Sequence, residues 1–588
     1  MRETVQRLGG RGLCAIAAAV ALAALVSGAA AASNGKGSGN DRLQRIDHIV
    51  VIYEENHSFD NLYGGWEGVN GVSNADPAHT TQVDQFGNPY SCLFQNDANL
   101  TSPPLSTVCS GVTPRSVAFN SHFSNAPFTI DDYIKPDFIT CPPTTNAFAF
   151  PNGILNPGIN PATGQPVPGA RPGGCTRDIV HKFYQEIYQL NGGAQNRYAT
   201  GSDAAGLVMG VYDTRQLPVY EYLHSGGHPH YAIADDFFQS AFGGSFLNHQ
   251  WLVAAATPVY PGAPANFHSL LDSAGFNHSN YPLYNPLAGA TYRDGDLTVD
   301  CTSPVKPGGA CGDYAVNTMQ PTYWPKGTFG DVLIPQTNPT IGDRLNAKGI
   351  DWAWYAGGWD NAIGNTTGLG YTNGPGPTCA DPNHDPGNST YPRCPDGLFQ
   401  YHHQPFNYYK SFDPSTAAGA ANRAAHLLDE EDFIAAANGS SKSCDLKPVS
   451  FIKPVGEENE HPGYASEPDG SDHLVDLLQE IENSACAKNT MVIVTYDEFG
   501  GQWDHVPPPG QAGNPGPHDS FGPGTRIPAL IVSPNLRGNE VIDHTQYDTT
   551  SILATIEERY GLAPLSTRDA AVNSLSNVFD AKQYEASK

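Results

Sequence analysis

Positively charged residues are scarce in this chain of 588 residues. It has 31 Lys and Arg residues against 59 Asp and Glu residues, and its formal net charge is −28 at pH 7. Such a chain repels polyanions, so we expect neither nucleic acid nor an anionic membrane surface as a partner. A phosphate group can be held only where a metal ion, histidines or backbone N–H groups supply local positive charge.

Long apolar runs are also few. The first 32 residues combine Arg2, Arg7 and Arg11 with an Ala/Leu/Val-rich stretch and Ala-x-Ala cleavage sites. This pattern is typical of an export signal, and the stretch is short for a membrane anchor, which is the alternative interpretation. No later segment approaches 18 apolar residues, so we predict no integral membrane segment after signal removal. We expect export to the periplasm or the extracellular medium.

The cysteines lack the Cys-x-x-Cys spacing that is typical of zinc–thiolate sites. Cys14 leaves with the signal, so ten of the eleven cysteines remain. An even number in an exported chain indicates disulfides, although sequence cannot prove their connectivity. The simplest scheme joins cysteines that are neighbours in sequence: Cys92–Cys109, Cys141–Cys175, Cys301–Cys311, Cys379–Cys394 and Cys444–Cys486.

The chain shows no internal repeat and no long linker. After the signal (1–32) we expect a flexible lead-in (33–44) and one large domain (45–588), with long Pro/Gly-rich loops. Apolar runs predict strands at 231–238, 351–355, 449–455, 491–496 and 527–532. Helical patterns occupy 177–190, 217–223, 422–437, 473–484 and 549–559, and further helices begin near 245 and 340. The alternation predicts an α/β fold: a mainly parallel central sheet flanked by helices, with disulfide-tied loops and room for a small inserted subdomain.

Two of the apolar runs end abruptly in oxygen-bearing side chains. The first, Ile46 to Tyr53, leads into Glu55 and Asn56, and the second, Met491 to Tyr496, leads into Asp497 and Glu498. Strands that are buried on both faces have continuous apolar sequences of this kind. Open α/β sheets bind their ligands at the carboxyl ends of such strands. Carboxylate and amide oxygens suit hard divalent cations. We predict that the two strand ends form one metal site; the alternative for each is an acidic turn or a helix cap.

Ser245 follows Gly243-Gly244 and is expected to open a helix. Helix amides there favour an anion, and a nearby metal ion lowers the pKa of a hydroxyl and makes it nucleophilic. A simple N-cap role for this serine is the alternative.

Histidines supply the remaining candidates for a phosphate site. They are His122, the adjacent His402 and His403, and His461 in an Asn-Glu-His-Pro sequence. Protonated imidazoles would provide the positive charge that the chain otherwise lacks, and they predict a mildly acidic optimum. Asp504 and His505 share the loop after the second strand; they either contact phosphate or only pair with each other.

Several of these blocks together resemble the bacterial phosphoesterase family of phospholipases C and acid phosphatases. They are Glu-Asn-His-Ser-Phe-Asp, Phe-Gly-Gly-Ser-Phe-Leu-Asn-His, Asn-Glu-His-Pro and Tyr-Asp-Glu-Phe-Gly-Gly-x-x-Asp-His-Val-x-Pro-Pro, at 55–60, 242–249, 459–462 and 496–509. The resemblance runs from about Arg45 to Asp569 and implies an alkaline-phosphatase-like fold.

The resemblance also implies roles for individual residues. Ser245 matches the nucleophile, and His402, His403 and His461 match phosphate-binding or proton-donating positions. His122 matches less closely. Phospholipases of the family often carry Thr where Ser245 stands, which favours the acid phosphatase branch. Glu55, Asn56, Asp497 and Glu498 match ligands of one divalent metal ion of unknown identity, with too few His and Asp residues for a two-zinc phosphatase. The sulfatase signature Cys-x-Pro-x-Arg is absent.

From these observations we predict an exported acid phosphatase that hydrolyses small-molecule phosphomonoesters through a phosphoserine at Ser245. The alternative within the family is a phospholipase C that acts on phospholipid phosphodiesters. A third hypothesis, from another class, is an inactive binding protein that uses Trp352, Trp354 and Trp359 for ligands.

Overall fold

The computed structural model describes residues 37–93, 110–112, 118–120, 124–130, 178–202, 205–226, 228, 230–271, 293–302, 308–325, 331–371, 399–438, 443–456, 458–462 and 467–585. The predicted signal and His122 lie outside these residues. So do the two predicted disulfides Cys141–Cys175 and Cys379–Cys394, together with Cys109.

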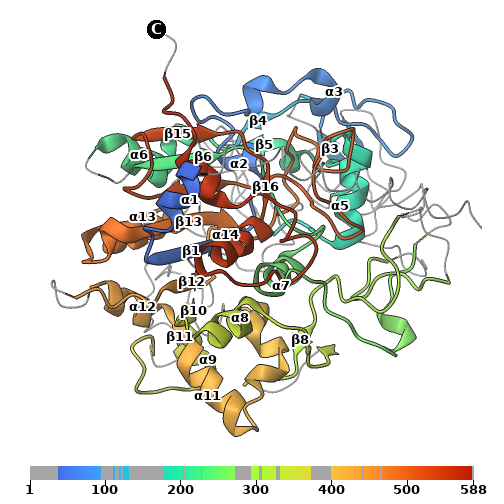
Figure 1. The fold of residues 1–588 in the computed structure, drawn as a ribbon. Helices are drawn as coiled ribbons and strands as arrows, with labels where there is room; N and C mark the ends of the chain where they lie inside the picture. The colour runs from blue at the N-terminus through green and yellow to red at the C-terminus, as the bar shows by residue number, and fades with distance from the viewer. Residues whose placement is uncertain are drawn as a thin grey trace, which may run out of the picture.

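An eight-stranded sheet forms the centre of the molecule (Figure 1). Its strands, in spatial order, are β11 (Leu427–Asp429), β10 (Trp352–Ala356), β12 (Val449–Lys453), β1 (His48–Glu54), β13 (Thr490–Tyr496), β14 (Ala529–Val532), β6 (Tyr231–Ala234) and β15 (Glu540–Asp543). All neighbouring pairs are parallel except those made by β14, which runs antiparallel to β13 and β6. The predicted α/β class with a mainly parallel sheet is confirmed.

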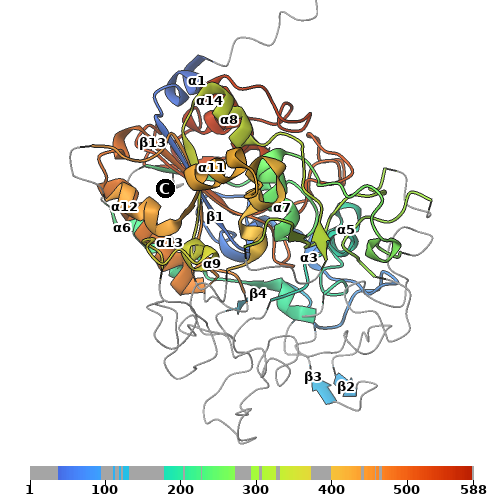
Figure 2. The ribbon, with the colours of Figure 1, turned by 90° about the horizontal axis from the view of Figure 1, so that it is seen from below.

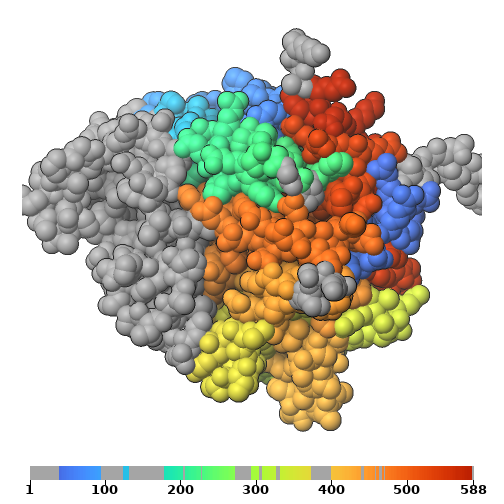
Figure 3. Space-filling view, turned by 90° about the vertical axis from the view of Figure 1, so that its left-hand side faces the viewer, coloured from blue at the N-terminus to red at the C-terminus, as the bar shows by residue number. Residues whose placement is uncertain are grey.

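Helices cover both faces of this sheet. On one side lie α6 (Pro218–Ser225), α12 (Glu430–Ala437) and α13 (Glu467–Asn483), and on the other α7 (Ser245–Ala254), α8 (Ile341–Lys348) and α14 (Thr550–Tyr560) (Figure 1 and Figure 2). Figure 3 shows the first side as a continuous surface, in which green α6 lies above orange α13 and the lighter α12. The remaining α-helices of the described ranges are α1 (Gly37–Leu43), α2 (Phe59–Leu62), α3 (Pro77–Thr80), α5 (Phe183–Leu190), α9 (Trp359–Ile363) and α11 (Ala417–His426).

Four small two-stranded sheets lie outside the central one. They pair β16 (Tyr547–Asp548) with β7 (Phe237–Phe238), β2 (Ser110–Val112) with β3 (Ala118–Asn120), β4 (Phe128–Thr129) with β5 (Gly210–Val211), and β8 (Gln320–Pro321) with β9 (Val332–Leu333). No helix in the described ranges is long and apolar enough to cross a membrane.

The predicted helix 422–437 is wrong in one respect, because a strand interrupts it. Helix α11 ends at His426, and Leu427 to Asp429 pair with β10. Asp429 then caps α12, since its side chain accepts from the Glu431 N–H and its own N–H donates to the Asp432 carboxylate. This reciprocal cap fixes a new helix start that the apolar periodicity alone conceals.

Buried aromatic side chains fill the core beside β10. Trp352 and Trp354 are fully buried, and Trp359 is 2% exposed. Trp354 donates its indole N–H to the His403 carbonyl, and Trp359 to the Leu427 carbonyl. These residues are packing elements of the core, so the structure does not support the hypothesis that they form a ligand-binding surface.

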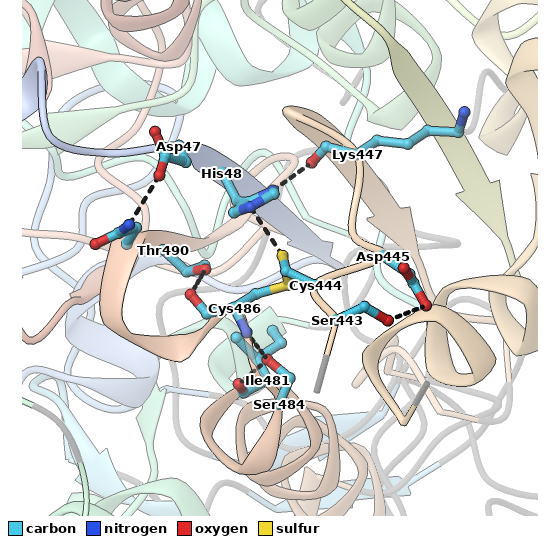
Figure 4. The surroundings of a disulfide bond; sticks show 11 residues. Asp47, His48, Ser443, Cys444, Asp445, Lys447, Ile481, Ser484, Cys486 and Thr490 are labelled. Atoms are coloured by element: carbon cyan, nitrogen blue, oxygen red, sulfur yellow. Dashed lines mark hydrogen bonds between the residues drawn. A yellow bond between two sulfur atoms is a disulfide. The ribbon is translucent and has the colours of Figure 1, made fainter. Parts of the chain in front are cut away.

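Two of the predicted disulfides are confirmed. Cys301 is bonded to Cys311, and Cys444 to Cys486. Cys92 is also disulfide-bonded. Figure 4 shows how the Cys444–Cys486 bond joins the loop before β12 to the connection between α13 and β13, next to His48 at the start of β1. The bond therefore links the amino ends of β12 and β13, and Cys444 Sγ also contacts His48 at the start of β1, which lies between them.

Candidate active site

The ends of β1 and β13 lie side by side at the centre of the sheet. The strands are paired in parallel from His48–Thr490 to Glu54–Tyr496, so the residues that follow emerge together. The Asp497 N–H donates to the Glu54 carbonyl over 3.0 Å. The four predicted ligands, Glu55, Asn56, Asp497 and Glu498, are all at most 1% exposed. Two segments distant in sequence thus form one buried group of oxygen atoms.

Glycine keeps these two strand ends close to each other. Gly500 has φ +61°, and a Cβ placed there would lie 2.1 Å from the Asn56 carbonyl oxygen. No larger residue fits at that separation, and the left-handed backbone also favours glycine. Asn56 itself has φ +63°, a conformation that Asn adopts more readily than most residues.

Ser245 is the first residue of α7 and lies directly against this group. Its Oγ is 3.2 Å from Glu55 Oε2, 3.3 Å from Asn56 Oδ1 and 3.4 Å from Glu498 Oε1. The preceding Gly243 has φ +88°, and a Cβ there would lie 2.7 Å from the Phe183 nitrogen. The tight Gly-Gly turn therefore allows the start of α7 to approach the strand ends.

The buried Glu186 side chain fixes this turn through hydrogen bonds. Its carboxylate accepts from the Gly243 N–H over 2.6 Å and from the Thr525 N–H over 2.7 Å. Gln239 also donates to it, over 3.0 Å, and Gln239 Oε1 accepts from the Phe499 N–H in turn. Burial raises the pKa of Glu186 to about 7. Glu186 thus positions Ser245 without touching it.

The oxygen group has the properties of a site for a hard divalent cation. Asp497 Oδ2 is buried and makes no hydrogen bond within the described part of the chain. Burial and the neighbouring Glu55 carboxylate raise the pKa of Asp497 well above its usual range. Burial and the Asp497 carboxylate likewise raise the pKa of Glu498 well above its usual range. Buried carboxylates in such proximity need a proton or a cation between them. The residues present therefore fit one oxygen-liganded metal ion.

Lys453, at the end of β12, provides positive charge at this site. Its Nζ lies 2.5 Å from Glu55 Oε1 and donates to the Tyr53 carbonyl over 2.9 Å. Burial alone would raise the pKa of Glu55, but Lys453 and His403 hold it well below its usual range. Our sequence analysis missed Lys453, although a lysine inside a buried strand almost always has a charged partner.

The three predicted catalytic histidines also meet here. His403 Nε2 is 2.8 Å from Glu55 Oε1, and His461 Nε2 is 2.7 Å from the Asn56 amide nitrogen. His402 lines the cavity in front of Ser245, and its Nδ1 has no hydrogen-bond partner among the described residues.

These imidazoles are not the positive charges that the sequence suggested. Burial lowers the pKa of His403 to about 4, lowers the pKa of His402 well below its usual value, and lowers that of His461. The expectation of protonated imidazoles is therefore corrected: in this protein Lys453 supplies the charge, because the histidines are deeply buried and beside it.

A cavity of about 450 Å³ opens in front of Ser245. Polar side chains line most of its wall, namely Asp178, His181, Lys182, Ser245, Asp296, Asn317, Thr318, Gln400, His402 and His461. This volume is sufficient for a small ligand that carries a phosphate group.

Comparison with known proteins identifies the family. The sequence pattern of the Phosphoesterase family matches residues 46–563. The chain belongs to this family. As a phosphoesterase it is a phosphoric ester hydrolase, as the sequence predicted.

Its relatives include proteins named as phospholipases. Phospholipase C B of Mycobacterium tuberculosis (strain ATCC 25618 / H37Rv) is 23% identical over 575 residues, which cover 93% of this chain and 80% of the relative. Non-specific phospholipase C6 of Arabidopsis thaliana is 28% identical over 153 residues, which cover 23% of this chain and 29% of the relative.

Among solved structures, a protein in the alkaline phosphatase superfamily from Vibrio parahaemolyticus is similar. It is 14% identical, and the match covers 40% of this chain and 51% of that chain with a TM-score of 0.19. The architecture given above rests on the strand order of the sheet.

Two further histidines of this phosphoesterase lie at the site, and our sequence analysis gave neither a role: His249, with its Nδ1 3.7 Å from Asp497 Oδ2, and His181. His181 lines the cavity, and its Nε2 is 3.3 Å from Glu498 Oε1. The signal in the sequence is Asp178-Ile179-Val180-His181, an acid and an imidazole immediately before a helix pattern. We chose His122 instead, which lies outside the described residues.

The prediction that Asp504 and His505 contact phosphate is corrected. They lie in a separate buried cluster, where Arg526 is 3.1 Å from Asp504 Oδ2 and His505 Nδ1 is 2.6 Å from Asp60 Oδ2. Neither lines the cavity in front of Ser245. Because Arg526 and Asp60 occupy both side chains, we no longer expect them to bind phosphate. The pairing that we considered between Asp504 and His505 themselves is replaced by pairing with these distant residues.

Proposed function

We propose that this phosphoesterase hydrolyses phospholipid phosphodiesters in the manner of a phospholipase C, with Ser245 as nucleophile. The observation that carries the proposal is the position of Ser245 Oγ, within 3.4 Å of three ligand-type oxygens and facing the cavity. The names of the relatives favour a phospholipid over the phosphomonoester that the sequence suggested.

We propose that one divalent metal ion binds at this site. Glu55, Asn56, Asp497 and Glu498 would hold it, since their oxygens surround Ser245 and Asp497 Oδ2 has no hydrogen-bond partner in the described ranges. Such an ion, when bound, favours the deprotonated serine and neutralises phosphate charge.

The chain's own residues then carry out an in-line displacement. Ser245 Oγ forms a bond to phosphorus while the bond from phosphorus to the lipid alcohol oxygen breaks. His402, a neutral imidazole in the cavity wall, takes the proton of the Ser245 hydroxyl and passes it to the departing alcohol oxygen. His403 and Lys453 hold Glu55 in place. Water then attacks the phosphoserine and releases the phosphorylated head group, which regenerates Ser245.

Replacement of the nucleophile tests this proposal. Ser245→Ala should lower kcat/KM for phosphatidylcholine vesicles more than about 1,000-fold, because the covalent step is lost. Ser73→Ala, at an exposed serine in the 3₁₀ helix η1 (Val72–Asn74), serves as the matched control and should leave the rate unchanged. Folding is checked by thermal unfolding. A Ser245→Ala variant that keeps a tenth of the wild-type rate would exclude Ser245 as nucleophile.

Phosphomonoester hydrolysis is the second candidate function. It is favoured by the polar wall of the cavity, where Lys182, Asn317 and Gln400 offer hydrogen bonds to a small polar substrate. The ratio of kcat/KM for p-nitrophenyl phosphate to that for phosphatidylcholine vesicles decides between the two functions. A ratio above about 100 would assign the enzyme to the acid phosphatases.

We also propose that the protein is exported. Disulfides such as Cys301–Cys311 and Cys444–Cys486 persist in oxidising compartments, which supports the signal interpreted from the first 32 residues. Fractionation of cells into cytosol, periplasm and medium tests this proposal, and N-terminal sequencing of the recovered protein tests signal removal.

A further inference from the structure

A second cavity, of about 370 Å³, lies away from the active site. Its wall comes from α1, from α14, from the segment 562–574 and from the 3₁₀ helix η12 (Leu575–Phe579). Figure 1 and Figure 2 both place α1 beside α14. None of its lining residues lines the cavity in front of Ser245.

The wall of this cavity is rich in hard oxygen atoms and has no cationic side chain. Four carboxylates line it, those of Glu557, Glu558, Asp569 and Asp580, together with hydroxyl and amide groups. No Lys, Arg or His residue is among its lining residues in the described part of the chain. The composition therefore suits a cation with a preference for oxygen ligands.

Glu557 and Asp569 are the most buried of these four carboxyl groups. Backbone N–H groups donate to both side-chain oxygens of Asp569: Leu565 donates to Oδ2 over 2.7 Å, and Ser566 and Ala570 donate to Oδ1 over 2.8 and 2.9 Å. Glu557 is only 5% exposed, and its Oε1 has no hydrogen-bond partner within the described ranges. Burial and the Asp569 carboxylate raise the pKa of Glu557 to about 9.

One basic residue, Arg344, acts on this pair: its charge lowers the pKa of Glu557, but burial and Asp569 outweigh that effect. Arg537 lies 2.6 Å from Asp580, while the Glu558 oxygens accept only from the neutral Asn40 and Ser576 side chains, each over 2.9 Å. Within the described part of the chain, no basic side chain lies at ion-pair distance from Glu557, Glu558 or Asp569. Two buried carboxyl groups that interact, with no basic side chain at ion-pair distance, require a shared proton or a bound cation.

We propose that this cavity binds a divalent metal ion of the calcium type through Glu557 and Asp569, with Glu558 close by. The ion is distinct from the one proposed at Ser245, and the inference does not depend on the proposed function. It joins the end of α14 to the segment 562–574, so its effect is on stability. Calcium accepts irregular oxygen cages that retain several waters, which agrees with a cavity larger than a bare ion.

The test uses the full chain with the active-site metal ligand removed, that is, the Asp497→Asn background. In this background Ca²⁺ should bind with one equivalent in calorimetry. At about 100 times its dissociation constant it should raise Tm by about 3 °C. Adding Glu557→Gln should abolish both effects. Adding Glu221→Gln instead, at an exposed glutamate on α6, is the matched control and should preserve both.

Proton release provides a second measurement that needs no variant of the cavity. At pH 7.5 the cation replaces the proton on Glu557, so calorimetry in two buffers of different ionisation enthalpy should give about one proton released per Ca²⁺. If Ca²⁺ neither binds nor changes Tm in the Asp497→Asn background, the proposal is overturned and the two carboxyl groups share a proton instead. Binding that survives Glu557→Gln, or that releases no proton, would also overturn it.

Discussion

The Lys453 ammonium lies 2.5 Å from Glu55 Oε1, and both side chains are fully buried. The lysine reaches this carboxylate from β12, the strand next to β1. A cation and an anion thus lie in contact at the buried centre of the sheet, next to the proposed nucleophile. This relationship determines which charges the site can tolerate, and it leads to the first prediction.

Lys453→Met should destabilise the chelator-treated protein by about 3–5 kcal/mol, because it removes the cationic partner of the buried Glu55 carboxylate and leaves only the His403 imidazole beside it. Urea unfolding measures the effect. Lys447→Met is the matched control: Lys447 pairs with Asp351 over 2.7 Å, but the Asp351 side chain is 59% exposed. An exposed pair of this kind contributes less than about 1 kcal/mol. Equal losses for the two variants would refute the special role of Lys453.

Asp497→Asn should lower both metal content and turnover. It removes one charge from a group of four oxygen-bearing residues, and we expect metal affinity to fall at least about 100-fold. Metal analysis of the dialysed protein, together with assays at saturating metal, separates loss of binding from loss of rate. Asp476→Asn, at an exposed position on α13, serves as control. Unchanged metal content in Asp497→Asn would remove Asp497 from the ligand set.

Glu186→Gln should lower kcat while KM changes little, because the amide cannot accept all the hydrogen bonds that hold the Gly243 turn. A loss of about 10- to 100-fold agrees with a displaced nucleophile. The exposed Glu221→Gln is the control. Full rescue by Glu186→Asp is not expected, since the shorter side chain withdraws the carboxylate from the turn. A Glu186→Gln variant with the wild-type rate would show that the Gly243 turn keeps its conformation without the Glu186 carboxylate.

His473 gives a prediction on pH. Its Nε2 lies 3.0 Å from Glu430 Oε1, and although burial alone would lower the pKa of His473, Glu458 and Glu430 raise it to about 10. A group whose folded pKa exceeds its unfolded value of 6.5 stabilises the fold fully below about pH 6.5, and this contribution disappears as pH rises through 10. His473→Gln should therefore cost about 3 kcal/mol at pH 6 and little above pH 10.

Chemical unfolding at several pH values measures this difference, with the exposed His518→Gln as control. A cost for His473→Gln that stays constant from pH 6 to pH 10.5 would mean that the ion pair with Glu430 does not stabilise the fold.

The amino-acid sequence by itself determined the strand ends and the chemistry that they carry. Short unbroken runs of Val and Ile are typical of buried strands, and a run that stops at Glu55-Asn56 or Asp497-Glu498 places oxygen-bearing side chains at the carboxyl edge of a parallel sheet. The glycines before Ser245 likewise allow a tight approach. These are local patterns, with periods and spacings that are visible in the chain.

Only the tertiary structure decided which distant groups meet those ends. It places His181 in the cavity wall and Lys453 next to Glu55. It also places Asp504 and His505 in a separate cluster with Arg526, and Glu557 next to Asp569. It also divides the predicted helix 422–437, because β10 offers Leu427 a strand partner. The reason is physical: the pKa and the role of a buried side chain depend on the groups that surround it, and long-range packing supplies those groups.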